Sequence, residues 1–350
     1  ELLMGTALVS TLGAASVAEA VTATMSGNHQ TGIEFDSPTG GTDTNAQIND
    51  NNFTVSLSET TDGGMTISSS FSIVNEASTS SSVGASDMDA GFSLAFTDGS
   101  KLDVLNAGNA SGSHAVSIPG SAGAEGVATT STMVAPTGLD FMTASTALGV
   151  EYHTASDFFA DGLKMSFSAS TDDGSAATAT YRVDSHFALG ATYVTDLGDS
   201  AVTLGAGYST TEGNKTGATS LSNDPGGFHV GLSAVTGDLT VAVGFADGDT
   251  TSGDTNANEV AGEVVKAGVK YVSGDLTFNV GIASGEAKDG VIGTAGTTTD
   301  SKDVTSASVS YAVAAGVTAI LGYTDVDSSD EGANDTTDGS AWYIGANMAF

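Results

Sequence analysis

Residues 265–283, VKAGVKYVSGDLTFNVGIA, contain two alternating segments on either side of a tight turn at Ser273-Gly274-Asp275. Every second residue of these segments is apolar: Val265, Ala267, Val269, Tyr271, Leu276, Phe278, Val280 and Ile282. The residues between them are small or polar: Lys266, Gly268, Lys270, Thr277, Asn279 and Gly281. A period of two with a glycine turn predicts two antiparallel strands that share one apolar face and one polar face.

The same hairpin unit recurs from residue 21 to residue 350, with two alternating kinds of connection. Short turns are predicted at 61–64, 98–100, 155–161, 195–199, 236–238, 273–275 and 313–316. Long polar loops are predicted at 36–51, 76–89, 107–145, 171–178, 211–226, 247–261, 285–302 and 326–338. Together these connections join about 16 antiparallel strands, which is typical of a transmembrane up-and-down β-barrel. The stretch 177–186 fits this scheme least and could form a separate strand pair.

A soluble β-sandwich would show the same alternation, because its apolar faces pack on each other and its polar faces meet water. Three observations favour the barrel. Closure removes the edges that an open sheet of this size would expose. Long and short connections alternate strictly, and aromatic residues gather at strand ends, where interfacial girdles belong. These aromatic residues are Tyr152, Tyr193, Tyr208, Phe245, Tyr271, Tyr323, Trp342 and Phe350.

The composition excludes several classes of protein. The chain has 350 residues, no cysteine, and 42 acidic against 8 basic side chains, for a formal net charge of -34. Such a charge repels phosphates, so we expect no nucleic-acid partner. Disulfides cannot stabilise the fold. The ordered apolar alternation also argues against disorder, although the chain is acidic and has few aromatic residues.

The first twenty residues are apolar and end in Ala18-Glu19-Ala20, an A-x-A pattern. We interpret 1–20 as a secretory signal peptide without its basic start, cut after Ala20. An N-terminal amphipathic or core helix is the alternative. The remaining residues, 21–350, are predicted to form a single barrel domain.

Several segments resemble a known family. LLMGTALVSTLGAASVAEAVTATMSGNHQTGIEF (2–35) resembles the signal peptide and first strand of general porins from alphaproteobacteria. FTVSLSETTDGGMTISSSFSIV (53–74) resembles their second and third strands, and Phe350 resembles the terminal aromatic by which the barrel assembly machinery receives outer-membrane proteins. The resemblance implies a trimeric, water-filled, 16-stranded barrel in the lipid of the bacterial outer membrane, open to small hydrophilic solutes and ions.

The resemblance also implies that the third long loop, 107–145, folds into the pore and narrows it. In that family acidic residues of this loop face basic residues of the wall, and Glu125 and Asp140 match the acidic role. The basic half departs from the pattern, since the chain has one arginine, Arg182, and seven lysines. Strand parity gives the expected pore-lining residues as Lys101, Lys164, Lys266, Lys270, Glu151, His153 and His229.

The acid excess predicts the selectivity of such a pore. Unpaired carboxylates in a confined water-filled passage raise the local concentration of cations and repel anions. We therefore expect a passive outer-membrane channel that prefers cations. Most of the acids could equally lie on external loops and only keep the surface hydrated. A secreted, acidic surface-layer or adhesin-like β protein is the alternative function.

Two acidic loops suit calcium, which takes 6–8 oxygen ligands. They are 247–259 and 325–338, and the second supplies the candidate ligands Asp325, Asp327, Asp330, Glu331 and Asp335. Neither loop has the EF-hand pattern, and solvated loops without metal are an equal alternative. We expect no required cofactor and no enzyme activity, because the five histidines are scattered and no serine or acid has a spacing typical of a triad.

Overall fold

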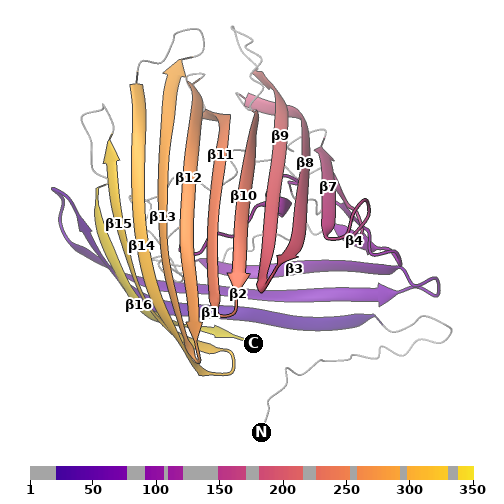
Figure 1. Ribbon diagram of the computed structural model, residues 1–350, viewed down its shortest axis with the longest axis horizontal. Coiled ribbons are helices and arrows are strands. Elements are labelled where there is room, and N and C mark those ends of the chain that lie inside the picture. Colours follow the sequence, from indigo (N-terminus) through magenta and orange to yellow (C-terminus); the bar gives the residue numbers. More distant parts are fainter. Residues whose placement is uncertain are drawn as a thin grey trace.

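The computed structural model describes residues 21–76, 91–105, 109–120, 149–170, 181–215, 226–252, 258–291, 298–329 and 338–350. In these residues sixteen antiparallel strands form one closed barrel (Figure 1), as the sequence predicted. The strands are β1 (Thr22–Pro38), β2 (Thr44–Thr60), β3 (Thr66–Glu76), β4 (Phe92–Ala95), β5 (Lys101–Val104), β6 (Gly149–His153), β7 (Leu163–Ser170), β8 (Tyr181–Leu197), β9 (Ser200–Lys215), β10 (Gly226–Thr236), β11 (Leu239–Ser252), β12 (Asn258–Ser273), β13 (Leu276–Val291), β14 (Thr298–Ala314), β15 (Val317–Ser329) and β16 (Gly339–Ala349). One short 3-10 helix, η1 (Gly112–His114), lies between β5 and β6 in the chain.

Each strand pairs with its neighbours in chain order, and β1 pairs with β16 to close the ring. At this closure the backbones of Gly27 and Phe350 exchange two hydrogen bonds of 3.0 Å. Closure gives every strand a neighbour on both sides, so the wall has no free edge strand. Among the described residues, no helix has the length and apolar character needed to cross a membrane.

The hairpin of β12 and β13 shows how the sequence pattern becomes two faces. The turn places Gly274 at a φ of 59°, a left-handed conformation that glycine adopts without strain. The apolar residues lie on the outside of the barrel, where Val280 and Ile282 are 52% and 54% exposed. The residues between them, such as Lys266 and Asn279, are buried on the inside.

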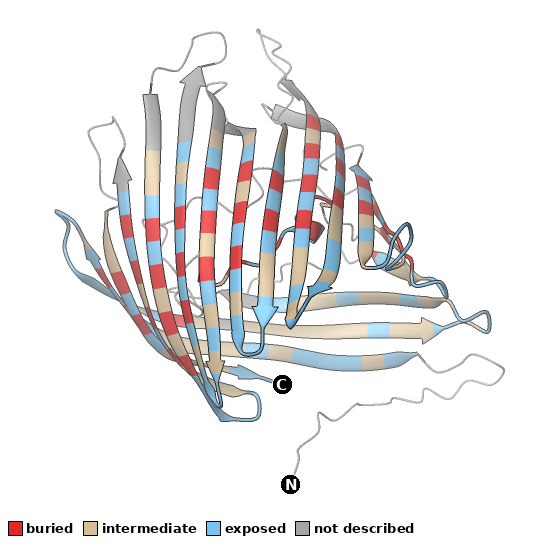
Figure 2. Ribbon diagram, in the orientation of Figure 1, coloured by how far each residue is buried: buried red, intermediate tan, exposed pale blue. Residues whose placement is uncertain are grey.

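The same alternation of exposed and buried residues runs along most strands (Figure 2). Apolar residues therefore face outward around the barrel. In a β-sandwich they would instead pack on each other in a dry interior. Exposing apolar surface to water costs roughly 25 cal/mol per Å². An apolar outer surface of this extent indicates a wall in contact with hydrocarbon.

The seven predicted short turns agree with the structure, but several predicted long loops were too long. β1 continues to Pro38 and β2 begins at Thr44, so most of the predicted loop 36–51 is strand. In the same way β11 continues to Ser252 and β12 begins at Asn258. Where both faces of a strand meet water, alternation fades, but the backbone pairing continues because its polar groups still need partners.

The stretch 177–186 does not form a separate strand pair in the residues described. From Tyr181 onward it belongs to β8, which pairs with β9 through a register shift between Val183 and Ser185. A bulge of this kind adds one unpaired residue and changes which face the following side chains occupy. The shift therefore explains why this stretch matched the alternation least well.

Candidate functional site

The barrel interior contains a chain segment, 109–120, which crosses the inner faces of β7 to β14. At its start the Ala110 amide donates a hydrogen bond to Ser168 Oγ on β7 (3.0 Å). At its end Ser306 Oγ on β14 donates one to the Gly120 carbonyl. Figure 1 shows η1 within the barrel, behind the strands of the near wall. These residues belong to the predicted constriction loop 107–145, of which 121–145, with Glu125 and Asp140, lies outside the described residues.

Glycines in the wall let this segment lie close to the strands. A Cβ atom added at Gly268 on β12 would overlap the carbonyl oxygen of Pro119, and one at Gly281 on β13 would overlap Gly120. The wall at these two places is therefore restricted to glycine while the segment lies against it.

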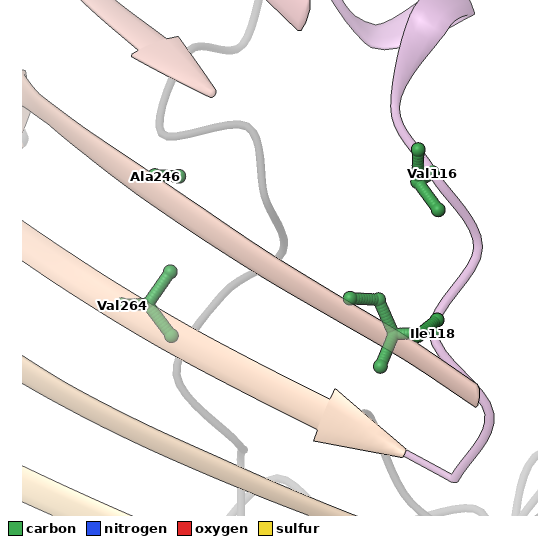
Figure 3. Close-up of a cluster of buried hydrophobic side chains, with 5 residues drawn as sticks. Val116, Ile118, Ala246 and Val264 are labelled. Carbon is green, nitrogen blue, oxygen red and sulfur yellow. The ribbon is translucent and has the colours of Figure 1, made fainter. Parts of the chain in front are cut away.

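The middle of the segment is held by apolar contacts. Val116 and Ile118 form a buried cluster with Ala242, Ala246 and Val264. Figure 3 shows Val116 and Ile118 on the segment, and Ala246 and Val264 on the strands β11 and β12. Burying these side chains stabilises the contact of the segment with the wall.

His114, in η1, links the segment to two strands. Its Nδ1 lies 2.7 Å from Thr192 Oγ1 on β8, and its Nε2 lies 2.7 Å from Ser166 Oγ on β7. The pKa of His114 is lowered from 6.5 to about 4. Burial is the main cause, and the nearby charges of Lys164, His153 and His229 act in the same direction. His114 is therefore neutral at pH 7 and held by hydrogen bonds.

A cluster of charged side chains lies beside His114, on β5 and β6. Lys101 Nζ is 2.7 Å from Asp103 Oδ2, and His153 Nε2 is 2.9 Å from the same oxygen. His153 Nε2 is also 3.6 Å from Glu151 Oε1, which accepts a 2.8 Å hydrogen bond from Ser113 Oγ in the segment. Register explains the grouping, because Lys101 lies opposite His153 and Asp103 opposite Glu151. Asp103 was missed by the sequence analysis, although its position two residues after Lys101 placed it on the same face.

A cavity of about 420 Å³ adjoins this cluster. It is lined by residues of the segment, of β6 to β8 and of the turn that follows β6: Ser113, His114, His153, Ser156, Gly162, Lys164, Thr192 and Val194. Two of the residues expected to line a pore, His153 and Lys164, therefore meet the same space.

The other expected pore-lining residues also lie on the inner side of the wall. Lys266 and His229 are buried there, and His229 Nε2 donates a 2.8 Å hydrogen bond to the Ser111 carbonyl. Lys270, half-buried, lies opposite Asn279, itself buried on the inner side. The structure thus brings Lys101, Glu151, His153 and Lys164 together, and leaves Lys266 and Lys270 on a different part of the wall.

The aromatic residues expected at a membrane interface lie on the outer face, with Phe350 the most exposed at 67%. Exposed with it are Tyr152, Tyr193, Tyr208, Tyr271 and Trp342. Tyr323 is half-buried against Trp342, with ring centroids 4.6 Å apart. Their place relative to a lipid interface stays a prediction.

The predicted calcium ligands are only partly described. Asp325 and Asp327 lie on β15 with exposed side chains, and Tyr323 Oη donates a 3.1 Å hydrogen bond to Asp325. Asp330, Glu331 and Asp335 lie outside the described residues. The two described carboxylates alone do not supply the oxygens that calcium requires.

Asp103, His153 and Ser166 form a hydrogen-bonded series that resembles a catalytic triad in order, with a 2.7 Å contact between His153 Nδ1 and Ser166 Oγ. Ser166 is 0% exposed and also contacts His114, so its hydroxyl offers no surface to a substrate. The sequence did not suggest this series because its members come from three strands. The series holds the segment in place and is unsuited to nucleophilic attack.

A closed sixteen-stranded barrel with an apolar outer face and charged residues inside defines a membrane-spanning β-barrel protein. The chain belongs to the Gram-negative porin family, whose family model matches residues 5–331. This family supports an outer-membrane porin channel of a bacterium rather than an enzyme.

Solved structures agree with this fold. A loop-deletion mutant of OmpT, an outer membrane protein of Vibrio cholerae, has a TM-score of 0.62 at 16% identity, over 95% of this chain and 100% of that one. A mutant of Rh. blastica porin has a TM-score of 0.61 at 15% identity, over 94% of this chain and 100% of that one. OmpT in its trimer form has a TM-score of 0.59 at 13% identity, over 95% and 100%. The comparison with curated protein sequences found no match.

Proposed function

We propose that this porin allows passive diffusion of small hydrophilic solutes and ions and prefers cations. The observation that carries the proposal is the division of the wall into an apolar outer face and an inner face with charged side chains. An inner face of this kind suits a water-filled passage, through which solutes move without a catalytic step.

The distribution of carboxylates supports the cation preference. Exposed acids lie where the strands approach the long loops, in cross-strand register: Asp247 opposite Glu263, Glu263 opposite Glu286, and Asp303 opposite Asp327. With 42 acidic against 8 basic residues in the chain, this end of the barrel attracts cations. Five described lysines on the inner side, Lys101, Lys164, Lys266, Lys270 and Lys302, weaken the effect within the wall.

The reversal potential in a salt gradient across a planar bilayer tests the selectivity. With purified protein and a tenfold gradient of KCl, we expect the sign of the potential that indicates cation permeation. The preference should decrease as salt rises, since screening shortens the reach of the charges. A potential of the opposite sign would refute the charge argument, and the absence of any channel activity would refute diffusion.

Several finer features belong to the same proposal, among them calcium binding by the acidic loop 325–338. The loop 107–145 narrows the passage with Glu125 and Asp140, which the position of 109–120 on the inner wall supports. The protein forms a homotrimer, as the trimer form of OmpT suggests. The resemblance of 2–35 and 53–74 supports the alphaproteobacterial branch, a signal peptide at 1–20 and recognition of Phe350 by the assembly machinery.

These features are tested separately. A shift of an unboiled sample on a detergent gel, together with cross-linking to three subunits, tests the trimer.

Calorimetric titration with calcium tests the acidic loop around Asp325 and Asp327, and the absence of heat would remove that site. Neutralising Glu125 and Asp140 together should lower the cation preference if they line the constriction.

A further inference from the structure

The cluster on β5 and β6 contains three side chains that could hold a metal ion. Asp103, Glu151 and His153 are buried, and one ligand atom of each lies within 4.8 Å of the others. Among the described residues this is the group of histidine and carboxylate side chains that meets this condition. We propose that it binds a divalent transition metal of the Zn²⁺ class, within the barrel wall.

The distances between the ligand atoms fit this class of metal. Zinc bonds of about 2.0–2.2 Å in tetrahedral geometry separate neighbouring ligand atoms by about 3.3–3.6 Å. His153 Nε2 lies 2.9 Å from Asp103 Oδ2 and 3.6 Å from Glu151 Oε1. A movement of a few tenths of an ångström brings His153 Nε2 to zinc spacing from both carboxylate oxygens.

Each proposed ligand is already oriented by a different serine. Ser93 Oγ on β4 donates to Asp103 Oδ1, and Ser113 Oγ donates to Glu151 Oε1 at 2.8 Å. Ser166 Oγ lies 2.7 Å from His153 Nδ1. When Nδ1 donates its proton to Ser166, the lone pair of Nε2 points toward the two carboxylates. Such outer hydrogen bonds fix the orientation of ligands in metal sites.

The site has an open side and a counter-charge that can leave. His153 also lines the cavity of about 420 Å³, which offers room for a water molecule as fourth ligand. The Lys101 side chain now neutralises Asp103 and is 43% exposed, so it can turn into the interior when a cation replaces it. One nitrogen and two carboxylate ligands suit zinc, cobalt or nickel, whereas calcium needs 6–8 oxygens.

Titration of the purified full-length protein in detergent with ZnCl₂, followed by calorimetry, tests the proposal. We expect one saturable site per chain. His153→Gln should weaken the affinity more than about 100-fold, because loss of a ligand exceeds the 10–100-fold effect of an outer partner. Ser93→Ala removes only such a partner and should weaken it by about tenfold.

His186→Gln is the matched control, since His186 is a buried wall histidine on β8 outside the cluster. It should leave zinc affinity unchanged. The shift of unboiled samples on a detergent gel verifies that each variant has folded. Glu151→Gln, which keeps its volume and its contact with Ser113, replaces His153→Gln if that variant does not fold, and the same loss is expected.

Cobalt gives a second readout. Bound Co²⁺ should show the visible absorption of a tetrahedral site, which zinc removes and excess calcium does not. Three results would overturn the proposal: no saturable zinc binding, equal affinity in His153→Gln and the unmodified protein, or displacement of cobalt by calcium. Because none of these measurements depends on conductance, failure of this site and failure of the channel function remain distinct.

Discussion

The wall from β5 to β7 and the wall from β13 to β16 enclose the same interior but carry different chemistry. In the first, charged side chains and histidines form a connected network with the segment 109–120. In the second, uncharged polar residues such as Ser306 and Thr324 are buried beside a cluster of small apolar residues: Ala283, Val304, Val326 and Ala341. In both walls the large exposed side chains near the middle of the strands are apolar.

The difference shows that lipid and interior constrain a barrel unequally. Every side chain that faces hydrocarbon must be apolar, so the parts of the strands in contact with lipid resemble one another. The interior imposes no common requirement, so the type of each inward residue depends on the groups that it contacts. The wall at β5 to β7 is polar because it must satisfy the polar groups of the segment that it holds.

We expect the largest effect when a side chain replaces a glycine that the segment 109–120 lies against. This change tests whether the interior wall depends on that contact. Gly268→Val should displace Pro119, because a Cβ there overlaps its carbonyl oxygen. Overpacking of this kind costs about 1–3 kcal/mol, and we expect about 3 kcal/mol because backbone must move. Thermal unfolding in detergent measures the loss, and single-channel conductance should change with it.

Gly63→Ala, in the turn between β2 and β3, is the control, since an added Cβ there meets only Thr61 Oγ1, at an ordinary contact distance of 3.9 Å. It should behave like the unmodified protein. Equal stability and conductance in Gly268→Val would show that the segment does not lie against β12.

An intermediate effect concerns pH. When the segment leaves the wall, the pKa of His114 returns from about 4 to its ordinary value near 6.5. The free segment then binds a proton more readily, so acidification favours release: attachment is full above pH 6.5 and weakens as pH falls toward 4. Limited proteolysis of the segment as a function of pH measures this.

His114→Gln keeps hydrogen-bonding groups but does not titrate, and should remove the pH dependence in that range. His29→Gln, which changes a histidine on β1, should retain it. Identical pH profiles for the protein and His114→Gln would assign the release to another group.

The smallest effect concerns the outer side of β11 to β13, next to the second wall. Glu263 lies opposite Asp247 and Glu286 on the exposed side of β11 to β13, and like charges in register repel each other. Glu263→Gln should therefore stabilise the barrel by about 0.2–1 kcal/mol at low salt, measured by thermal unfolding. The gain should vanish at high salt, and a loss of stability would mean that the carboxylates are bridged by cations.

The sequence predicted the barrel, the strand number, the short turns and the inward position of Lys101 and His153, because strand parity depends only on neighbouring residues. It did not predict the contact of His114 with Ser166, which are 52 residues apart and meet only across the interior. Asp103 was within reach of the parity argument and was missed. Strand ends such as Pro38 could not be read, because backbone pairing continues where alternation stops.

The seam between β1 and β16 has a consequence for how the molecule forms. Tyr343 Oη donates a hydrogen bond to the Thr31 carbonyl across 312 residues of chain, whereas every other pair of adjacent strands is joined directly along it. Hairpins can therefore be added one by one to an incomplete sheet. The outer edges of its first and last strands stay unpaired and can pair with another chain. Until β1 and β16 pair, the incomplete sheet can aggregate with another copy through these edges. The edges must therefore be protected from other chains before the barrel closes.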